Sequence, residues 1–274
     1  MAVPVAGLTG KTMGYVAGPK EFYDSLASEY HVLFEDWWRA AMWHGGIIAS
    51  LLAARGVGEH SRVLDCTCGI GTQALPLAVL GYHVTGTDLS QRSVERARME
   101  ARARGLQIDL EVADVRRVRK VVVGHFDAVI SCDNALSHLL TEADLDEAID
   151  NVRACLRGGG LLIASVRDYD ALAIARPTGI PIALHGPSGE RHGAGQAWVW
   201  SPAGDQLQIA LFTLAEGPNG VWNAAAHETT LRALRRSELT AALAQHGFEA
   251  VHWLMPEDSG YYQPIVVAVA ESQT

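Results

Sequence analysis

The stretch VLDCTCGIGTQALPLAVLGYHVTGTDLS, residues 63–90, places the strongest constraint on the fold of this 274-residue chain. It starts with a short apolar run that reaches a turn at Gly69 and Gly71, where a backbone can bend sharply and approach a ligand closely. A mostly apolar helix follows, then a second apolar strand that ends at Asp88. Strand, glycine turn, helix and strand with a terminal carboxylate form half of a nucleotide site, in which Asp88 is expected to bind a ribose diol.

Two cofactors fit this spacing. The glycines, with residues 69–74 reading GIGTQA, match the relaxed dinucleotide fingerprint, so an NAD-dependent oxidoreductase remains an alternative. Asp65 precedes the glycines, where its charge would repel a pyrophosphate but attract an amino group. Asp65 therefore favours S-adenosylmethionine (SAM). A third hypothesis is a regulator that binds the cofactor without catalysis.

Four segments, "VLDCTCGIGT", "VTGTDLS", "EVADV" and "LRGGGLLIAS", resemble the successive motifs of class I SAM-dependent methyltransferases. Within that class, "CDNALSHLL" followed by "RDYD" is similar to the glycine N-methyltransferase group and its small-molecule relatives. The resemblance, over roughly residues 20–170, implies SAM as methyl donor and S-adenosylhomocysteine (SAH) as product, with Asp114 near the adenine amino group. The expected cofactor contacts are Tyr30, Trp38, Asp65, Cys66, Gly69, Gly71, Asp88, Leu89, Asp114, Val115 and Cys132.

Alternation of strands and helices predicts an α/β fold, a Rossmann-like doubly wound sheet whose ligands bind at the carboxyl ends of the strands. We expect buried strands at 126–131 and 265–270, the last one antiparallel, and a helix at 141–157 that the glycines at 158–160 end before a strand from Leu161. We also expect an N-terminal helical lid and a small antiparallel β insertion, whose three strands follow a Pro/Gly-rich connection to Gly195. The expected segments are a flexible arm at 1–19, lid helices at 20–56, the cofactor-binding core at 57–170, the β cap at 171–235 and the last helix and strands of the core at 236–274.

Methyl transfer from a sulfonium mainly requires alignment and desolvation of the acceptor. A histidine titrates near neutral pH and can remove the acceptor proton, so His138 is the first choice of base, with Tyr23 as a second catalytic candidate. Arg167 matches the family's arginine for an acceptor carboxylate, and Asn134 and Trp37 are further substrate candidates.

Seven tryptophans suit a flat acceptor. We therefore expect a heteroaromatic such as an indole-type ring in secondary metabolism, methylated on nitrogen or carbon, with a glycine or sarcosine-type amine as the alternative.

A net charge of -9 and a pI of about 5.6 argue against a nucleic-acid partner, which needs a basic face. The spacing of Cys66, Cys68, Cys132 and Cys155 fits neither a metal site nor a secreted disulfide framework, so no metal is expected. No signal peptide or membrane-spanning run is evident, which predicts a cytoplasmic protein without a membrane partner. The sequence does not exclude a homo-oligomer.

Overall fold

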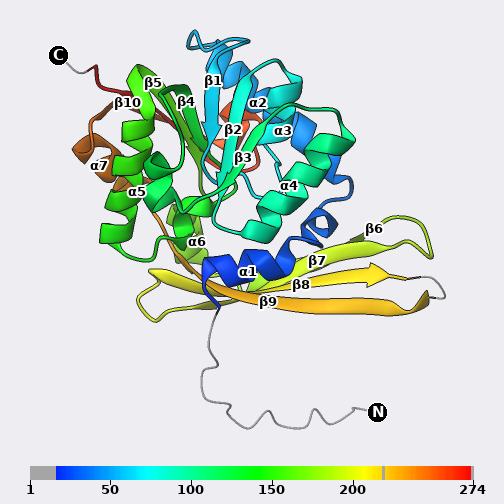
Figure 1. Ribbon diagram of the computed structural model, residues 1–274. Helices are drawn as coiled ribbons and strands as arrows, with labels where there is room; N and C mark the ends of the chain where they lie inside the picture. The colour runs from blue at the N-terminus through cyan, green and yellow to red at the C-terminus, as the bar shows by residue number, and fades with distance from the viewer. Residues whose placement is uncertain (1–16, 218–219, 273–274) are drawn as a thin grey trace.

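The computed structural model describes residues 17–217 and 220–272. Its core is a seven-stranded sheet in the order β10-β11-β5-β4-β1-β2-β3 (Figure 1). The last strand, β11, runs antiparallel to both β10 and β5, whereas the pairs from β5 to β3 are parallel. The predicted doubly wound sheet with an antiparallel last strand is thus confirmed. The strands are β1 Arg62–Asp65, β2 His83–Asp88, β3 Asp109–Val112, β4 Phe126–Ser131, β5 Leu156–Ser165, β10 Phe248–Leu254 and β11 Ile265–Ala270.

Helices cover both faces of this sheet because successive strand residues point to opposite sides. Val63 belongs to an apolar cluster with helices α2, α3 and α4, whereas its neighbour Leu64 packs with α5 and α7 on the other face. The covering helices are α2 Trp37–Ala53, α3 Ala74–Val79, α4 Gln91–Ala103, α5 Glu142–Cys155 and α7 Arg236–Gln245. No helix in the described part of the chain is long and apolar enough to cross a bilayer.

The expected lid region contains α1 Pro19–Leu26 and the short 3-10 helix η1 Tyr30–Leu33 ahead of α2. Most of the arm expected at 1–19, residues 1–16, lies outside the described residues. Helix α1 lies between the core and a second sheet (Figure 1). Asp24 accepts hydrogen bonds from Ser90 Oγ (2.7 Å) and from the Arg92 amide at the start of α4 (3.2 Å). Helix α1 is therefore tied to the core.

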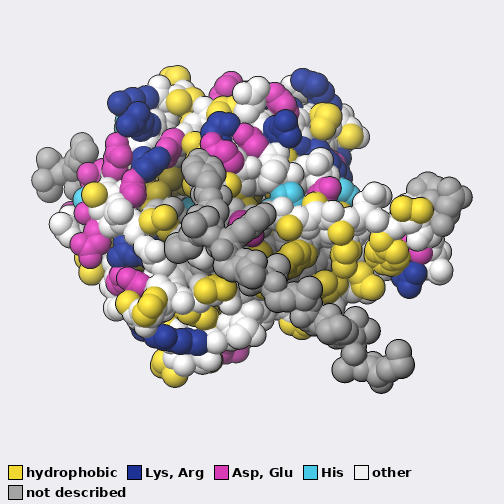
Figure 2. Space-filling model, turned by 90° about the horizontal axis from the view of Figure 1, so that it is seen from below, with side chains coloured by type: hydrophobic (Ala, Val, Ile, Leu, Met, Phe, Trp, Pro, Cys, Tyr) yellow, Lys and Arg dark blue, Asp and Glu magenta, His cyan; other side chains and the backbone are white. Residues whose placement is uncertain are grey.

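The second sheet is an antiparallel meander of β6 Gly179–His185, β7 His192–Trp200, β8 Gln206–Glu216 and β9 Trp222–Arg232. The expected β insertion is thus present, but we expected three strands and a Pro/Gly-rich connection where β6 lies. The glycines there serve close strand pairing. A Cβ at Gly193 would lie 1.9 Å from the Ala183 carbonyl oxygen of β6. Seen from below, apolar side chains gather over the outer side of the molecule near these strands (Figure 2).

Three shorter helices join these parts: η2 Val115–Lys120, η3 Ala135–His138 and α6 Tyr169–Ala175, and α8 Pro256–Ser259 precedes β11. The glycines at 158–160, expected to end α5 before a strand from Leu161, instead lie inside β5. The register of β5 against β4 shifts between Phe126 and Ala128, so the glycines absorb an irregularity of the strand.

Candidate functional site

Two adjoining cavities open at the carboxyl ends of the core strands, where a doubly wound sheet binds its ligands. The smaller cavity, of about 390 Å³, lies over β1, β2 and the segment that follows β3, and we call it the donor cavity. The larger, of about 860 Å³, lies between the core and the four-stranded sheet, and we call it the acceptor cavity. Four residues line both cavities and form their shared wall: Tyr23, Tyr30, Asp133 and His138.

The glycine turn and Asp88 form one side of the donor cavity. Gly69 has a φ of +54°, which favours glycine, and its amide donates to Asp88 Oδ2 (2.9 Å). The Ser90 amide donates to Asp88 Oδ1 (2.8 Å). Burial raises the pKa of Asp88 to about 6, even though both amides stabilise the charged form. The carboxyl group is held in a fixed orientation and retains lone pairs for hydroxyl donors.

Asp65 lies beneath the same turn and is almost fully buried, at 1% exposed. Its Oδ1 accepts from the Thr67 amide (3.3 Å), whereas its buried Oδ2 has no hydrogen-bond partner. Burial first, and then the negative charges of Asp88 and Asp133, raise the pKa of Asp65 well above its ordinary value. A buried carboxyl oxygen without a partner fits a cationic or donor group on a ligand.

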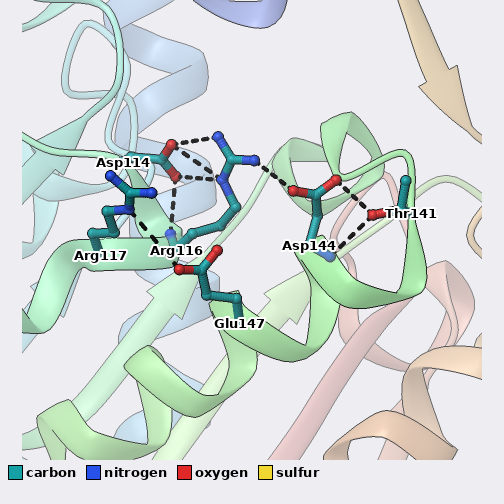
Figure 3. A network of polar contacts seen from close by, with 6 residues as sticks. All are labelled: Asp114, Arg116, Arg117, Thr141, Asp144 and Glu147. Carbon is teal, nitrogen blue, oxygen red and sulfur yellow. Dashed lines mark hydrogen bonds and ion pairs between the residues drawn. The ribbon is translucent and has the colours of Figure 1, made fainter.

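The far end of the donor cavity is closed by a network of ion pairs between η2 and α5 (Figure 3). The Arg116 guanidinium contacts both oxygens of Asp114, at 2.6 Å to Oδ2, and also pairs with Asp144. Burial acts to raise the pKa of Asp114, but the hydrogen bonds from Arg116 outweigh it and the pKa is lowered. Thr141 caps α5 and donates to Asp144 (2.6 Å). Arg116 thus holds the carboxylate that we expect beside adenine.

Tyr23 of α1 and His138 of η3 meet in the shared wall, with 3.1 Å between the phenol oxygen and His138 Nε2. His138 Nδ1 is buried and has no partner. Burial, and then the positive charge of Arg167, lower the pKa of His138 to about 4, and burial raises the pKa of Tyr23. The histidine is therefore neutral at pH 7, which differs from the near-neutral titration that we expected of a base.

Asp133, which is not among the site residues expected from the sequence, is one of the four residues of the shared wall. Its Oδ1 accepts from Tyr261 (2.5 Å) and Tyr262 (2.9 Å), and its Oδ2 accepts from Gln73 Nε2 (2.9 Å). Its φ of +58° is uncommon outside glycine. The available signal was its place directly after β4, where strand-end side chains face a ligand.

One face of the four-stranded sheet lines the acceptor cavity through alternate residues of β8, such as Ile209 and Leu211. Phe212, the next residue after Leu211, points to the opposite face of the sheet and is exposed. Arg167 projects between core and sheet. One of its amino groups donates to Gln196 (3.1 Å), its guanidinium carbon lies 4.9 Å from the ring centre of Trp198, and its buried Nη1 has no partner. The cavity is thus largely apolar with one free cationic donor.

Two expected contacts, Trp37 and Trp38, lie away from the donor and acceptor cavities. Trp37 is buried in the core and donates to Thr72 (3.2 Å), and Trp38 stacks on Arg104, 4.0 Å from the ring centre to Cζ. Neither tryptophan lines the donor or the acceptor cavity, because α2 turns this part of its aromatic face toward the core and the end of α4. Asn134 borders the acceptor cavity, but its amide is occupied by internal hydrogen bonds with Tyr169, Ser137 and the Arg167 amide.

The remaining expected residues lie at the two cavities or directly beneath them. Gly71, like Asp65, supports the donor cavity from below and does not line it. The four cysteines are free and buried. No group of metal-ligating side chains occurs within residues 17–217 and 220–272. The expected residues that line the donor cavity are Tyr23, Tyr30, Cys66, Gly69, Asp88, Leu89, Asp114, Val115, Cys132 and His138.

Comparison with known proteins places this geometry among methyltransferases. Residues 63–160 match the family described as methyltransferase domain. A glycine/sarcosine N-methyltransferase of Parasynechococcus marenigrum is 32% identical over 179 residues, which cover 65% of this chain and 58% of that protein. The chain therefore spans less than two thirds of the length of this curated relative.

Solved structures share the fold across nearly the whole chain. DesVI of Streptomyces venezuelae has a TM-score of 0.71 at 19% identity, covering 93% of this chain and 100% of that one. SAM-bound CalS10, an amino pentose methyltransferase of Micromonospora echinaspora, has a TM-score of 0.67 at 20% identity, covering 88% and 94%. With the sheet order and the carboxylates that end or follow β1, β2 and β3, the chain has the fold of the class I SAM-dependent methyltransferases, and its residues 63–160 belong to the methyltransferase domain family.

Proposed function

We propose that this protein transfers a methyl group from SAM to a small-molecule acceptor. The observation that carries this proposal is that the donor cavity, whose residues fit SAM, adjoins the larger apolar acceptor cavity along the shared wall. In-line displacement requires the nucleophile and the methyl group to meet at one point, with water excluded. Tyr23 and His138 stand at that point.

The residues that line the donor cavity, together with Asp65 beneath it, fit SAM. Asp65 offers a buried unpartnered oxygen to the amino group, Asp88 offers its carboxylate to the ribose hydroxyls, and Asp114 with Arg116 would border the adenine. Bound SAM would supply an electrophilic methyl group on a sulfonium. A pyrophosphate at the glycine turn would instead lie next to the carboxyl groups of Asp65 and Asp88, which disfavours NAD.

His138 and Tyr23 would orient the acceptor. Because the pKa of His138 is about 4, its imidazole stays neutral and can accept or donate a hydrogen bond without storing a proton at pH 7. The high pKa of Tyr23 keeps its phenol protonated. We therefore propose that this pair aligns the attacking atom and passes its proton toward solvent.

The acceptor would be considerably larger than glycine, because a cavity of about 860 Å³ is in the range for drug-sized ligands. Its apolar walls are compatible with the heteroaromatic acceptor of secondary metabolism, and Arg167 with an anionic substituent. The tryptophans of α2, however, give that reading no support, since Trp37 and Trp38 face the core. Methylation of an amine is the second candidate, favoured by the position of Asp133.

Calorimetry with SAH and a mass-spectrometric screen of amines, phenols and indoles test the proposal. We expect SAH to bind and a methylated product to form. The His138→Ala variant should lower turnover by roughly 10² or more while SAH affinity changes little. The exposed His125→Ala serves as control. Failure to bind SAH, or binding of NADH in its place, would refute the proposed function.

A further inference from the structure

The carboxylate of Asp133 has a hydrogen-bond position left for a ligand, in the wall that the donor and acceptor cavities share. Its three side-chain partners, Tyr261, Tyr262 and Gln73, are all neutral donors. A carboxylate offers about four lone-pair positions, so roughly one remains for a ligand. Because Asp133 lines both cavities, that position faces the place where donor and acceptor meet.

The backbone is built to present this carboxylate. Asp133 and Asn134 both adopt left-handed conformations, with φ of +58° and +71°, and the Asp133 amide is fixed by Ser165 Oγ (2.8 Å). Two successive left-handed non-glycine residues are costly and persist where the surroundings impose them. The three donors then hold the carboxylate in one orientation.

Aromatic side chains line the acceptor cavity together with Asp133. Tyr30, His44 and Tyr262 line the same cavity, and the rings of His44 and Tyr262 stack at 5.1 Å with an interplanar angle of 26°. His44 Nδ1 is buried without a partner, as are Arg167 Nη1 and His138 Nδ1. Aromatic faces with a carboxylate attract an ammonium group, and the orphaned atoms indicate a polar ligand.

We propose that Asp133 binds the acceptor nitrogen, so that the acceptor is an aliphatic amine attached to a bulky apolar body. This inference rests on the proposed function and names its substrate class. The ammonium first releases one proton to water. The nitrogen lone pair then forms the N–C bond as the S–C bond breaks, the electron pair remains on sulfur, and SAH and a methylated ammonium result. Asp133 accepts an N–H throughout and stabilises the positive charge as it moves from sulfur to nitrogen.

The test compares tryptamine with tryptophol, which carries a hydroxyl in place of the amine, by calorimetry on the protein saturated with SAH. Tryptamine should bind at least about tenfold tighter than tryptophol, as expected for an added charged contact. Asp133→Asn keeps the shape and tolerates the left-handed backbone, and should abolish this preference. The control Glu249→Gln removes an exposed charge on β10 and should retain it. In the presence of SAM, mass spectrometry should locate any new methyl group on the side-chain nitrogen.

Equal binding of the two compounds, binding of neither, methylation of the ring, or an unchanged preference in Asp133→Asn would overturn the inference. The inference would also be overturned if Asp133→Asn changed only the ratio of SAM to SAH affinity. Such a result would mean that Asp133 interacts with the sulfonium of the donor and not with the acceptor nitrogen. SAH binding distinguishes a failure of the proposed function from a failure of the role inferred for Asp133. Its absence refutes the proposed function, whereas SAH binding without a preference for the amine refutes only the role of Asp133.

Discussion

Gly71 illustrates, at the scale of one residue, how the donor cavity depends on a missing side chain. Its φ is +97°, and a Cβ there would lie 2.6 Å from Leu75 Cγ at the start of α3. Gly71→Ala should therefore lower the free energy of unfolding by about 1–3 kcal/mol and weaken SAH binding, as measured by denaturation and calorimetry. Gly46→Ala in α2 is the matched control, because no atom lies within 4 Å of its Cβ. An unaffected Gly71→Ala protein would show that the turn can relax.

Asp88 predicts how cofactor binding depends on pH. The carboxylate is the form that accepts ribose hydroxyls together with two amides, and its pKa in the free protein is raised to about 6. Affinity for SAH should be constant well above pH 6 and fall by about tenfold per pH unit as the pH drops below it, since one proton must then be released. Asp88→Asn should bind weakly and lose the inflection near pH 6. Persistence of that inflection would assign it to another group.

Residues at strand ends could be predicted from sequence, because the chemistry of Asp65 and Asp88 is tied to the order of motifs. The positions of the Trp37 and Trp38 rings could not be predicted, because an aromatic run on a helix does not indicate which neighbouring element each ring will contact. Asp133 was missed for a related reason. Its role arises from Gln73, Tyr261 and Tyr262, which are distant along the chain and come together only in the fold.

At the scale of elements, helix α1 is held by three successive residues that contact three different parts of the protein. Tyr23 meets His138 in η3, Asp24 meets the start of α4, and Ser25 lies 2.7 Å from His227 Nδ1 in β9. An eight-residue helix is too short to be stable alone, so these contacts order it.

Ser25→Ala should loosen α1 selectively, because it leaves the His227 nitrogen, on a side chain that is 7% exposed, without its partner. Hydrogen exchange over residues 19–26 should become faster, by roughly 5- to 150-fold for a loss of about 1–3 kcal/mol, while β4 and β5 stay protected. Ser50→Ala, which removes an exposed hydroxyl from α2, should leave α1 unchanged. Equal acceleration throughout the chain would contradict a local role.

Element prediction succeeded where apolar periodicity was strong, as for β4 and β11. The prediction was wrong at β6 and at the start of β7, where Gly193 and Gly195 favoured a connection over a strand. Glycine marks both a turn and a close approach of two backbones, and the sequence does not distinguish them. The partner strand that makes Gly193 necessary is visible only in the paired sheet.

At the scale of the whole molecule, the cofactor should bind the folded chain only, because Gly69, Asp88 and Asp114 converge from separate segments. SAH at about 100 times its dissociation constant should then stabilise the fold by about 2.7 kcal/mol. The melting temperature would rise by several degrees for a protein of this size, as followed by calorimetric melting. NADH at equal concentration should leave the melting temperature unchanged, and Asp88→Asn should lose the shift. A larger shift with NADH would support the dinucleotide alternative.

The alternation along β8 and β9 has a consequence for how such a protein changes during evolution. Ile209, Leu211 and Leu231 reach the acceptor cavity from a sheet that contributes nothing to the donor cavity. Substitutions at these positions can reshape the acceptor cavity while the strands keep their pairing and the methyl donor keeps its contacts. Selection for a new acceptor can therefore act on one sheet without disturbing the reaction that the other supports, and a directed-evolution library would be best concentrated there.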